Sequence, residues 1–356
     1  MSGISLCMIV KNEEANMESC LSSAAAFVDE IIIVDTGSTD RTKEIALRYT
    51  GKVYDFPWTD DFSAARNYSI SEASNEYILV LDGDEQLLSM DRDEIERLKQ
   101  AYPEGVGRIL LINQYTRKDY TYKQQERLSR LFSKEFYHYE GRIHEQLIRF
   151  GKREAAQADG IVYEAPVTVK HLGYEGDLAV RRSKTQRNIK LLKKAREQEP
   201  DDPYLLYQLG KSFYMEEDYK NACGYFEQAL YFDLNPRLEY VQDMVESYGY
   251  TLINTGQYEK SLQLLSVYEE FSHSADFLFL SGLIQMNNGE FEGAIREFKK
   301  AAEKAYSKVE GVNGDLAFYN IGAIYECLGD YECAGKYYRK CIGYEPALRR
   351  LKDMVE

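Results

Sequence analysis

The chain has 356 residues, of which 29% are charged and 44% are hydrophobic, and this composition is typical of a globular protein long enough for two domains. Acidic residues outnumber basic ones by 59 to 44, a formal net charge of −15, whereas nucleic-acid-binding proteins usually carry a basic surface. No apolar run approaches the roughly 20 residues that a membrane span needs. The sequence therefore argues against nucleic-acid-binding and membrane-spanning proteins.

The N-terminal sequence and the cysteines bear on the cellular compartment. Lys11 and Glu13 interrupt the first apolar run too early for a secretory signal peptide. The six cysteines include no C-x-x-C pair and stand among apolar neighbours, a pattern that favours reduced thiols over a disulfide framework or a zinc site. We therefore expect a cytoplasmic protein.

Short apolar runs alternate with helical patterns in the first half of the chain. Strands are expected at 4–10, 31–35, 52–56 and 77–81, and helices at 12–28, 39–48 and 63–74. Strands that are apolar throughout and separated by helices predict a parallel sheet covered on both faces, an α/β domain of Rossmann-like type. Such sheets bind ligands beyond the carboxyl ends of their strands, so we expect the functional residues there.

The second half contains no comparable strands but repeats a pattern of glycines. Gly210, Gly249, Gly282 and Gly322 are each followed by an aromatic residue 9 positions later and a small residue 12 positions later. The small residues let two helices approach closely, and we expect the aromatics to fill the gap to the next helix pair. This register predicts three or four tetratricopeptide repeats, whose ideal period of about 34 is lengthened in two connections.

A basic helix is expected between the two halves, at 181–196, in an otherwise acidic chain. Such a run is usually a solvated helix face, but its position beside the predicted site makes an anion-binding role the alternative. We expect an α/β domain over 1–175, a basic linker helix over 176–200 and an all-α repeat domain over 201–356.

Three polar segments follow the predicted strands. Asp82-Gly83-Asp84-Glu85 comes directly after the strand at 77–81, and two carboxylates flanking a glycine can hold Mg²⁺ or Mn²⁺, although a turn with solvated acids also fits. Asp35 follows the second strand and can accept hydrogen bonds from a base or a ribose, while Thr39 or Asp40 can cap the next helix. The third segment covers residues 58–67, and its Arg66 is expected at the same end of the sheet.

These residues carry a resemblance. The runs SLCMIVKNEE, EIIIVDTGSTDRT, W-x-x-D-F-S-x-A-R-N and L-D-G-D-E resemble family 2 glycosyltransferases, which have the GT-A fold. ERLSRLF (126–132), GRIHEQL (141–147), VKHLGY (169–174) and K-x-x-R-N (184–188), together with the repeats, resemble bacterial peptide S- and O-glycosyltransferases of the sublancin type. The resemblance covers essentially the whole chain, but its motifs say less about sugar and acceptor than about transfer from a nucleotide sugar.

The resemblance implies roles for individual residues. Asp84 matches the direct metal ligand, and His171 is the candidate second ligand, although a lone histidine is more often structural. Glu145 is the candidate general base, against an alternative in which it only pairs with Arg142 or Arg127. The residues expected to bind the nucleotide sugar are Val10, Asn12, Glu13, Asp35, Arg66, Asp82, Gly83, Arg127, Arg130, Lys184 and Arg187. For the last four of these, from Arg127 onward, a diphosphate-binding role and an ordinary salt bridge stay open.

The function expected from the sequence is therefore an inverting transferase that needs Mg²⁺ or Mn²⁺. It would move a sugar from a UDP-sugar, UDP-glucose or UDP-N-acetylglucosamine, to a Cys, Ser or Thr side chain of a peptide or protein held by the repeats. One alternative acceptor is a cell-surface or lipid-linked glycan. Another alternative is a non-catalytic repeat adaptor, and the repeats are also compatible with a homodimer.

Overall fold

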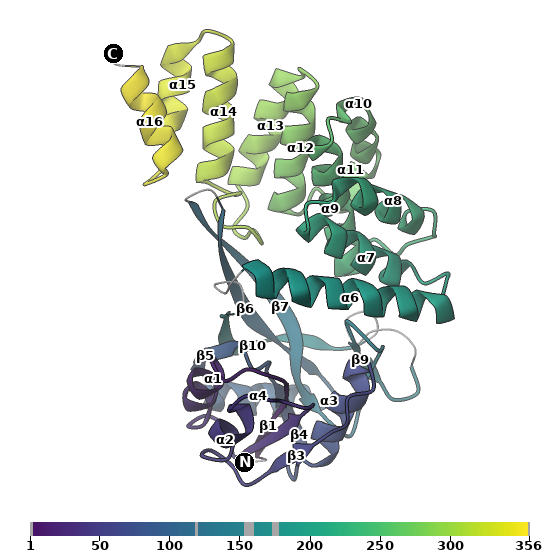
Figure 1. Ribbon diagram of the computed structural model, residues 1–356. Helices are drawn as coiled ribbons and strands as arrows, with labels where there is room; N and C mark the ends of the chain where they lie inside the picture. Colours follow the sequence, from purple (N-terminus) through teal and green to yellow (C-terminus); the bar gives the residue numbers. More distant parts are fainter. Residues whose placement is uncertain (1–2, 118–119, 153–159, 173–177, 355–356) are drawn as a thin grey trace. The chain divides into compact units, whose positions relative to one another are not determined.

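The computed structural model describes residues 3–117, 120–152, 160–172 and 178–354 (Figure 1). The chain divides into two compact units, Met1–Gln198 and Glu199–Glu356. The first unit is built around a β-sheet, and the second is helical throughout its described residues. None of the described helices combines the length and the apolar character needed to cross a membrane.

An eight-stranded, mostly parallel sheet forms the centre of the first unit, with the order β3-β2-β1-β4-β7-β6-β10-β5. Its strands are β1 (Ile4–Val10), β2 (Glu30–Asp35), β3 (Val53–Asp55), β4 (Tyr77–Val80), β5 (Glu85–Met90), β6 (Val106–Arg117), β7 (Tyr120–Ser133) and β10 (Val162–His171). The strands β1 to β4 are parallel, β7 runs antiparallel between β4 and β6, and β5 is an antiparallel edge strand. A separate hairpin-like sheet pairs β8 (Tyr137–Glu140) with β9 (Gln146–Arg149).

The first four strands lie where the sequence predicts them, but their helices are shorter. The helices of this unit are α1 (Met17–Ala24), α2 (Thr42–Ala46), α3 (Phe62–Ser71), α4 (Arg92–Ala101) and α6 (Leu178–Gln198). Instead of starting near residue 12, α1 begins at Met17, because Asn12 has a left-handed backbone with φ of 55° that no helix can include. The residues lost from α1 and α2 form the loops that follow β1 and β2.

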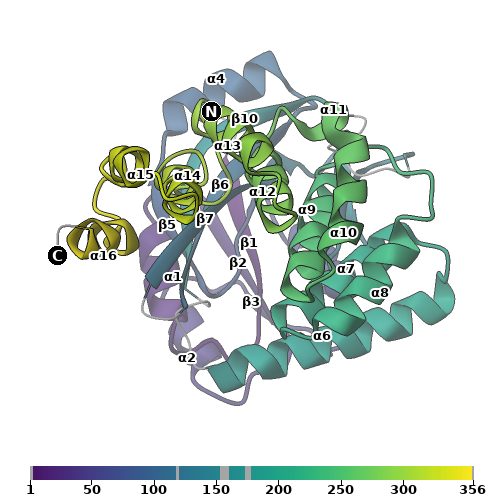
Figure 2. The same ribbon diagram turned by 90° about the horizontal axis from the view of Figure 1, so that it is seen from above.

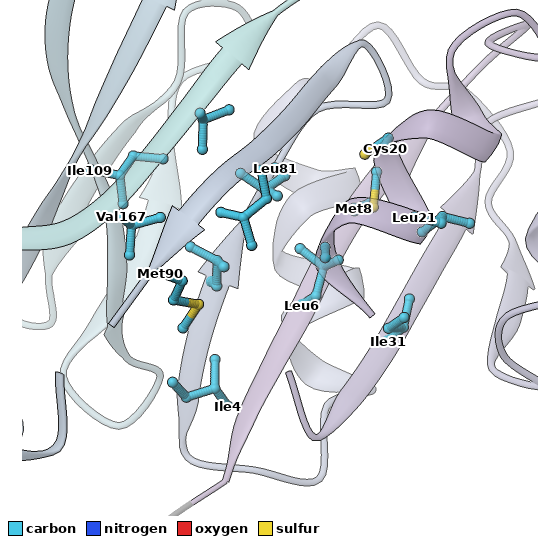
Figure 3. Close-up of a cluster of buried hydrophobic side chains, with 14 of the residues drawn as sticks. Ile4, Leu6, Met8, Cys20, Leu21, Ile31, Leu81, Met90, Ile109 and Val167 are labelled. Atoms are coloured by element: carbon cyan, nitrogen blue, oxygen red, sulfur yellow. The ribbon is translucent and has the colours of Figure 1, made fainter. Parts of the chain in front are cut away.

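Apolar side chains cover both faces of the sheet, as its continuous hydrophobic strands predict. Ile4, Leu6 and Met8 of β1 pack on one face against α1, where Cys20 and Leu21 meet them (Figure 3). Cys7, the alternate residue of the same strand, belongs to the cluster on the other face. With both faces buried, the polar groups of this region collect at the strand ends.

The second unit is a series of helix pairs. Its helices are α7 (Pro203–Met215), α8 (Tyr219–Ala229), α9 (Glu239–Asn254), α10 (Tyr258–Ser261), α11 (Tyr268–Phe271), α12 (Ala275–Asn287), α13 (Phe291–Ala302), α14 (Asp315–Cys327), α15 (Tyr331–Tyr338) and α16 (Glu345–Asp353). Both views show α12 beside α13 and α14 beside α15 (Figures 1 and 2). The aromatic residue 9 positions after each repeat glycine is the first residue of a second helix, namely of α8, α10, α13 and α15.

The repeat glycines are the points where paired helices touch. A Cβ atom on Gly210, Gly282 or Gly322 would lie 2.6–2.7 Å from the ring of an aromatic residue 16 positions later in the partner helix. These rings are therefore packed between the two helices of their own pair, and the Phe226 ring also meets Tyr248 of α9 in the next pair. The second repeat departs from this pattern, since Gly249 faces Leu264 and Leu280 and a 3₁₀ segment, Leu262–Val267, interrupts its second helix.

This packing yields a stability prediction with an internal control. Gly210→Ala would push a methyl group into the Phe226 ring, so we expect it to lower the free energy of unfolding by about 1–3 kcal/mol. Gly224→Ala, in α8 with open space at its Cβ, should be neutral or stabilise by up to about 1 kcal/mol. Urea denaturation followed by circular dichroism measures both, and equal stability of the two variants would contradict the close-contact argument.

Candidate active site

The carboxyl ends of β1 and β2 position the first group of predicted residues. Asp35 ends β2 and is only 2% exposed. Its Oδ2 accepts hydrogen bonds from the backbone N–H groups of Gly37 (3.0 Å) and Ser38 (2.9 Å). Its other oxygen, Oδ1, is buried and has no hydrogen-bond partner among the described residues. A buried acceptor without a partner is costly, so this oxygen is suited to a donor group on a ligand.

The loop after β1 is tied to the loop after β2. The Asn12 side chain accepts a hydrogen bond from the backbone N–H of Thr39 (2.8 Å), and the Asn12 N–H donates to the hydroxyl of Ser38 (2.9 Å). The carbonyl of Val10 accepts a hydrogen bond from the backbone N–H of Thr36 (2.9 Å). Both residues thus shape the rim around Asp35.

The D-G-D-E segment follows β4, with its glycine against the β1 loop. A Cβ atom on Gly83 would lie 2.9 Å from Cγ of Glu13. The Glu13 side chain can therefore come this close only because residue 83 is a glycine. This contact brings the carboxylate of Glu13 toward that of Asp84, and Lys184 of α6 bonds to both. Its Nζ lies 3.2 Å from Asp84 Oδ2 and 3.3 Å from Glu13 Oε1.

His171 lies beside Asp84, where the sequence predicts a second metal ligand. Its Nε2 is 3.4 Å from Asp84 Oδ2, and its Nδ1 is 3.0 Å from the side-chain oxygen of Asn113 on β6. The pairing of β10 with both β5 and β6 fixes this arrangement. Asn113 was not predicted from the sequence, because its burial and its contact with His171 depend on how β6 pairs with β10.

The electrostatics favour the charged forms of Asp84, His171 and Lys184, whereas burial and the charge of Asp84 raise the pKa of Glu13. Burial alone would raise the pKa of the Asp84 carboxyl, but hydrogen bonding and charge from His171, with the charge of Lys184, lower it below the usual range. Burial alone would lower the pKa of His171, but the hydrogen bond and charge of Asp84 raise it. The pKa of Lys184 is likewise raised, since Asp84 and Glu13 outweigh its burial.

A second charged cluster lies behind Asp82. The guanidinium of Arg66, on α3 and 8% exposed, donates from Nη2 to Asp82 Oδ1 (2.8 Å) and from Nε to Glu145 Oε1. Arg130 of β7 donates from Nη2 to the other oxygen of Asp82 (3.0 Å). Glu145 is therefore bound to Arg66 and not to Arg142 or Arg127, the partners that the sequence alternative named. The candidate base and the D-G-D-E segment are joined through one buried arginine.

Burial and the charges of the arginines together determine the pKa values of Asp82 and Glu85. Burial opposes ionisation of Asp82, but Arg66 and Arg130 hold its pKa well below the usual range. Burial raises the pKa of Glu85 to about 7, opposed by Arg130 and aided by Asp82. Arg66 Nη1, Arg130 Nη1 and the Tyr139 hydroxyl are buried without hydrogen-bond partners in the described part of the chain. Glu85, the last residue of the D-G-D-E segment, and Tyr139 were not predicted as site residues, and no local motif distinguishes Tyr139.

Arg127 and Arg187, the remaining predicted cations, have other hydrogen-bond and ion-pair partners. Arg127 pairs with Glu164 of β10 (2.8 Å). Arg187 lies over the Phe62 ring, 5.5 Å from its centroid, and bonds to Asn188. The segment VKHLGY ends at positions 173 and 174, which lie outside the described residues.

Comparison with known proteins decides the class. Residues 5–156 match the profile of glycosyl transferase family 2, and residues 175–237 and 316–348 each match a tetratricopeptide repeat. Residues 5–156 of the first unit therefore form a glycosyl transferase family 2 domain. The resemblance found in the sequence, to a glycosyltransferase with repeats behind it, is confirmed.

Several curated proteins are similar to this chain in sequence. A TPR repeat-containing protein of Synechococcus elongatus is 28% identical over 97% of this chain and 76% of its own length. The SPbeta prophage-derived glycosyltransferase SunS of Bacillus subtilis is 27% identical over 67% of this chain and 56% of its own length. A glycosyltransferase of Rickettsia felis is 31% identical over 38% of this chain and 50% of its own length. The matches thus span only about half of the last two relatives.

The Arg66 bridge predicts a large stability effect. Arg66→Met would leave the buried Glu145 carboxylate without its arginine partner, so we expect a loss of about 3–5 kcal/mol in the free energy of unfolding. Arg41→Met is the control, because Arg41 forms an exposed ion pair with Glu14 that should contribute less than about 1 kcal/mol. Urea titration compares the two variants. Similar losses of unfolding free energy would show that the buried Arg66 ion pairs stabilise the protein no more than an exposed pair does.

Proposed function

We propose that the chain is an inverting, metal-dependent glycosyltransferase that moves a sugar from a UDP-sugar to a Cys, Ser or Thr side chain of a peptide or protein. The observation that carries the proposal is the Arg66 guanidinium, which bonds to both Glu145 and Asp82. It holds a candidate base next to the segment that carries Asp84. Such an arrangement suits a reaction in which deprotonation of the acceptor and departure of a diphosphate occur side by side.

Donor recognition is assigned to the ends of β1 and β2. The Oδ1 atom of Asp35 would accept a hydrogen bond from the N–H of the uracil base or from the ribose, since it is buried and has no partner among the described residues. Val10, Asn12 and Glu13 shape the wall beside it. Asp82, whose two oxygens bond to arginines, supports the site from behind and holds Gly83 in place. UDP-glucose and UDP-N-acetylglucosamine are the donors to test first.

The donor set at Asp84 fits a hard divalent cation. No group of three or more His, Cys, Asp or Glu side chains among the described residues is arranged to hold a metal. Asp84 Oδ2 and His171 Nε2 nevertheless converge, 3.4 Å apart. Mg²⁺ and Mn²⁺ commonly take one or two protein ligands and complete their shell with substrate phosphates and water. The chemistry such a cation supplies is neutralisation of the charge on the departing diphosphate.

Glu145 is assigned as the general base. Arg66 occupies its Oε1, so Oε2 is the oxygen that would take the proton from the acceptor as the acceptor attacks the anomeric carbon. The new bond forms on the face opposite the breaking bond to the diphosphate, which inverts the configuration. A cysteine acceptor places less demand on the base, because a thiol has a pKa of roughly 8.5. Lys184, Arg130, Arg127 and Arg187 are proposed to bind the diphosphate.

The repeats are proposed to hold the acceptor. Stacked helix pairs form extended surfaces that commonly bind segments of other proteins, which favours a peptide or protein over a surface or lipid-linked glycan. The resemblance of the sequence motifs and repeats to peptide glycosyltransferases of the sublancin type supports the same choice. The retention of Asp35, Asp84 and Glu145 argues against a non-catalytic adaptor. All six cysteines are unpaired, as a cytoplasmic location would require, and a homodimer stays a prediction.

Two substitutions separate donor binding from chemistry. Glu145→Gln should bind UDP and Mn²⁺ normally but transfer sugar about 10²–10⁴-fold more slowly, because it lacks the base. Asp84→Asn should lose the metal dependence of UDP binding as well. Calorimetry and a turnover assay measure the two properties, with Glu140→Gln, an exposed carboxylate paired with His138, as control. Unchanged turnover in Glu145→Gln would remove this residue as the base.

The acceptor is tested by mass spectrometry. Peptides that differ only in a central Cys, Ser or Ala are incubated with the protein, UDP-glucose or UDP-N-acetylglucosamine, and Mn²⁺. We expect a hexose or N-acetylhexosamine mass on the Cys or Ser peptide and none on the Ala peptide. Transfer to a lipid-linked glycan, with all three peptides unmodified, would favour the alternative acceptor.

A further inference from the structure

Lys184 differs from the arginines of the site because it forms an ion pair with Asp84, the candidate metal ligand. Its Nζ is 3.2 Å from Asp84 Oδ2, and His171 Nε2 is 3.4 Å from the same oxygen. The ammonium and the imidazole therefore share one carboxylate oxygen. A divalent cation held by Asp84 and His171 would have to take that oxygen too.

The position of Lys184 depends on how α6 lies on the first unit. Lys194 bonds to Asp60 (3.1 Å), and Arg187 lies over the ring of Phe62. These contacts hold the helix beside the start of α3, so Lys184 reaches the two acids from one side. Its side chain is 45% exposed, against 12% for Asp84 and 15% for Glu13. The two acids are largely buried, whereas the lysine has a long flexible side chain that is nearly half exposed to solvent.

Charge balance shows why the lysine cannot stay in place when a metal binds. The carboxylates of Glu13 and Asp84 face one ammonium, a group of low net charge. Adding a divalent cation at the same oxygen would bring like charges together and leave the site positive. The negatively charged diphosphate of a donor would neutralise this excess and offer the ammonium new oxygen acceptors.

We propose that Lys184 is a resident cation that occupies the Asp84 carboxylate in the empty enzyme and exchanges to the donor diphosphate when a metal ion binds. This inference rests on the proposed function for the identity of the diphosphate, but the competition with metal concerns the empty protein alone. The exchange couples the two binding events: the metal binds weakly without donor, and donor and metal bind tightly together. The coupling is reciprocal, because each ligand must raise the affinity of the other by the same factor.

The test is Lys184→Met, which removes the charge and keeps a similar chain length. We expect this variant to bind Mn²⁺ alone more tightly than the wild type, by at least about fivefold, as measured from the free Mn²⁺ signal in electron paramagnetic resonance. In saturating Mn²⁺, the same variant should bind UDP more weakly by a comparable factor, measured by calorimetry. Lys184→Arg, which keeps a cation at this position, should preserve the coupling.

Two controls make the result specific. Lys190→Met, an exposed lysine on the same helix, removes the same charge elsewhere and should leave both affinities unchanged. Adding Asp84→Asn to Lys184→Met should abolish the gain in Mn²⁺ affinity, which identifies Asp84 as the ligand concerned. Thermal melts check that each variant is folded.

The outcomes separate this inference from the proposed function. Opposite changes in Mn²⁺ and UDP affinity support the exchange. Unchanged Mn²⁺ affinity in Lys184→Met would overturn it, whatever the protein does with nucleotides. If wild-type protein and variants bind no UDP while Lys184→Met still gains Mn²⁺ affinity, the proposed donor is wrong and the occupation of Asp84 by Lys184 stands.

Discussion

The buried guanidinium of Arg66 lies between two carboxylates from distant parts of the chain. Glu145 is 79 positions from Arg66 in sequence, and Asp82 is 16 positions away. A charge buried in this way is tolerated only when it is paired and hydrogen-bonded, so the three groups must be assembled together or not at all. The N-terminal cap of α3, where Asp61 accepts a hydrogen bond from the backbone N–H of Ala64, fixes the helix that carries Arg66. The position of the candidate base thus depends on how α3 and the loop after β4 pack at the carboxyl end of β4.

The segment after β4 carries two acids with different surroundings. Asp82 is bonded through both oxygens to arginines, whereas Asp84, two residues later, faces His171 and Lys184. The turn between them depends on Gly83, because any side chain there would collide with Glu13. A short D-G-D segment thus places one carboxylate against two arginines and the other against a histidine and a lysine. Close packing on glycine also organises the second unit, where helix pairs meet at Gly210, Gly282 and Gly322.

Much of this arrangement could be predicted from the sequence, for physical reasons. The strands β1, β2 and β4 are largely apolar, so their extent and their ends are visible locally, and with them Asp35 and Asp84. The repeat register is visible because each helix pair needs a small residue at its closest approach. The strands β6, β7 and β10 carry many polar residues and give no such signal. Pairing of Arg66 with Glu145, and of His171 with Asn113, depends on strand order, which no local pattern encodes.

We propose that the strand ends around Asp35 and Asp84 bind a uridine nucleotide together with a metal ion. The most direct measurement is the melting temperature of the whole chain with a panel of nucleotides and sugar nucleotides, with and without Mn²⁺. A ligand present at 100 times its dissociation constant should stabilise the protein by about 2.7 kcal/mol. The account predicts a rise with UDP that requires Mn²⁺ and grows with one UDP-sugar. No rise with any nucleotide, with or without metal, would contradict it.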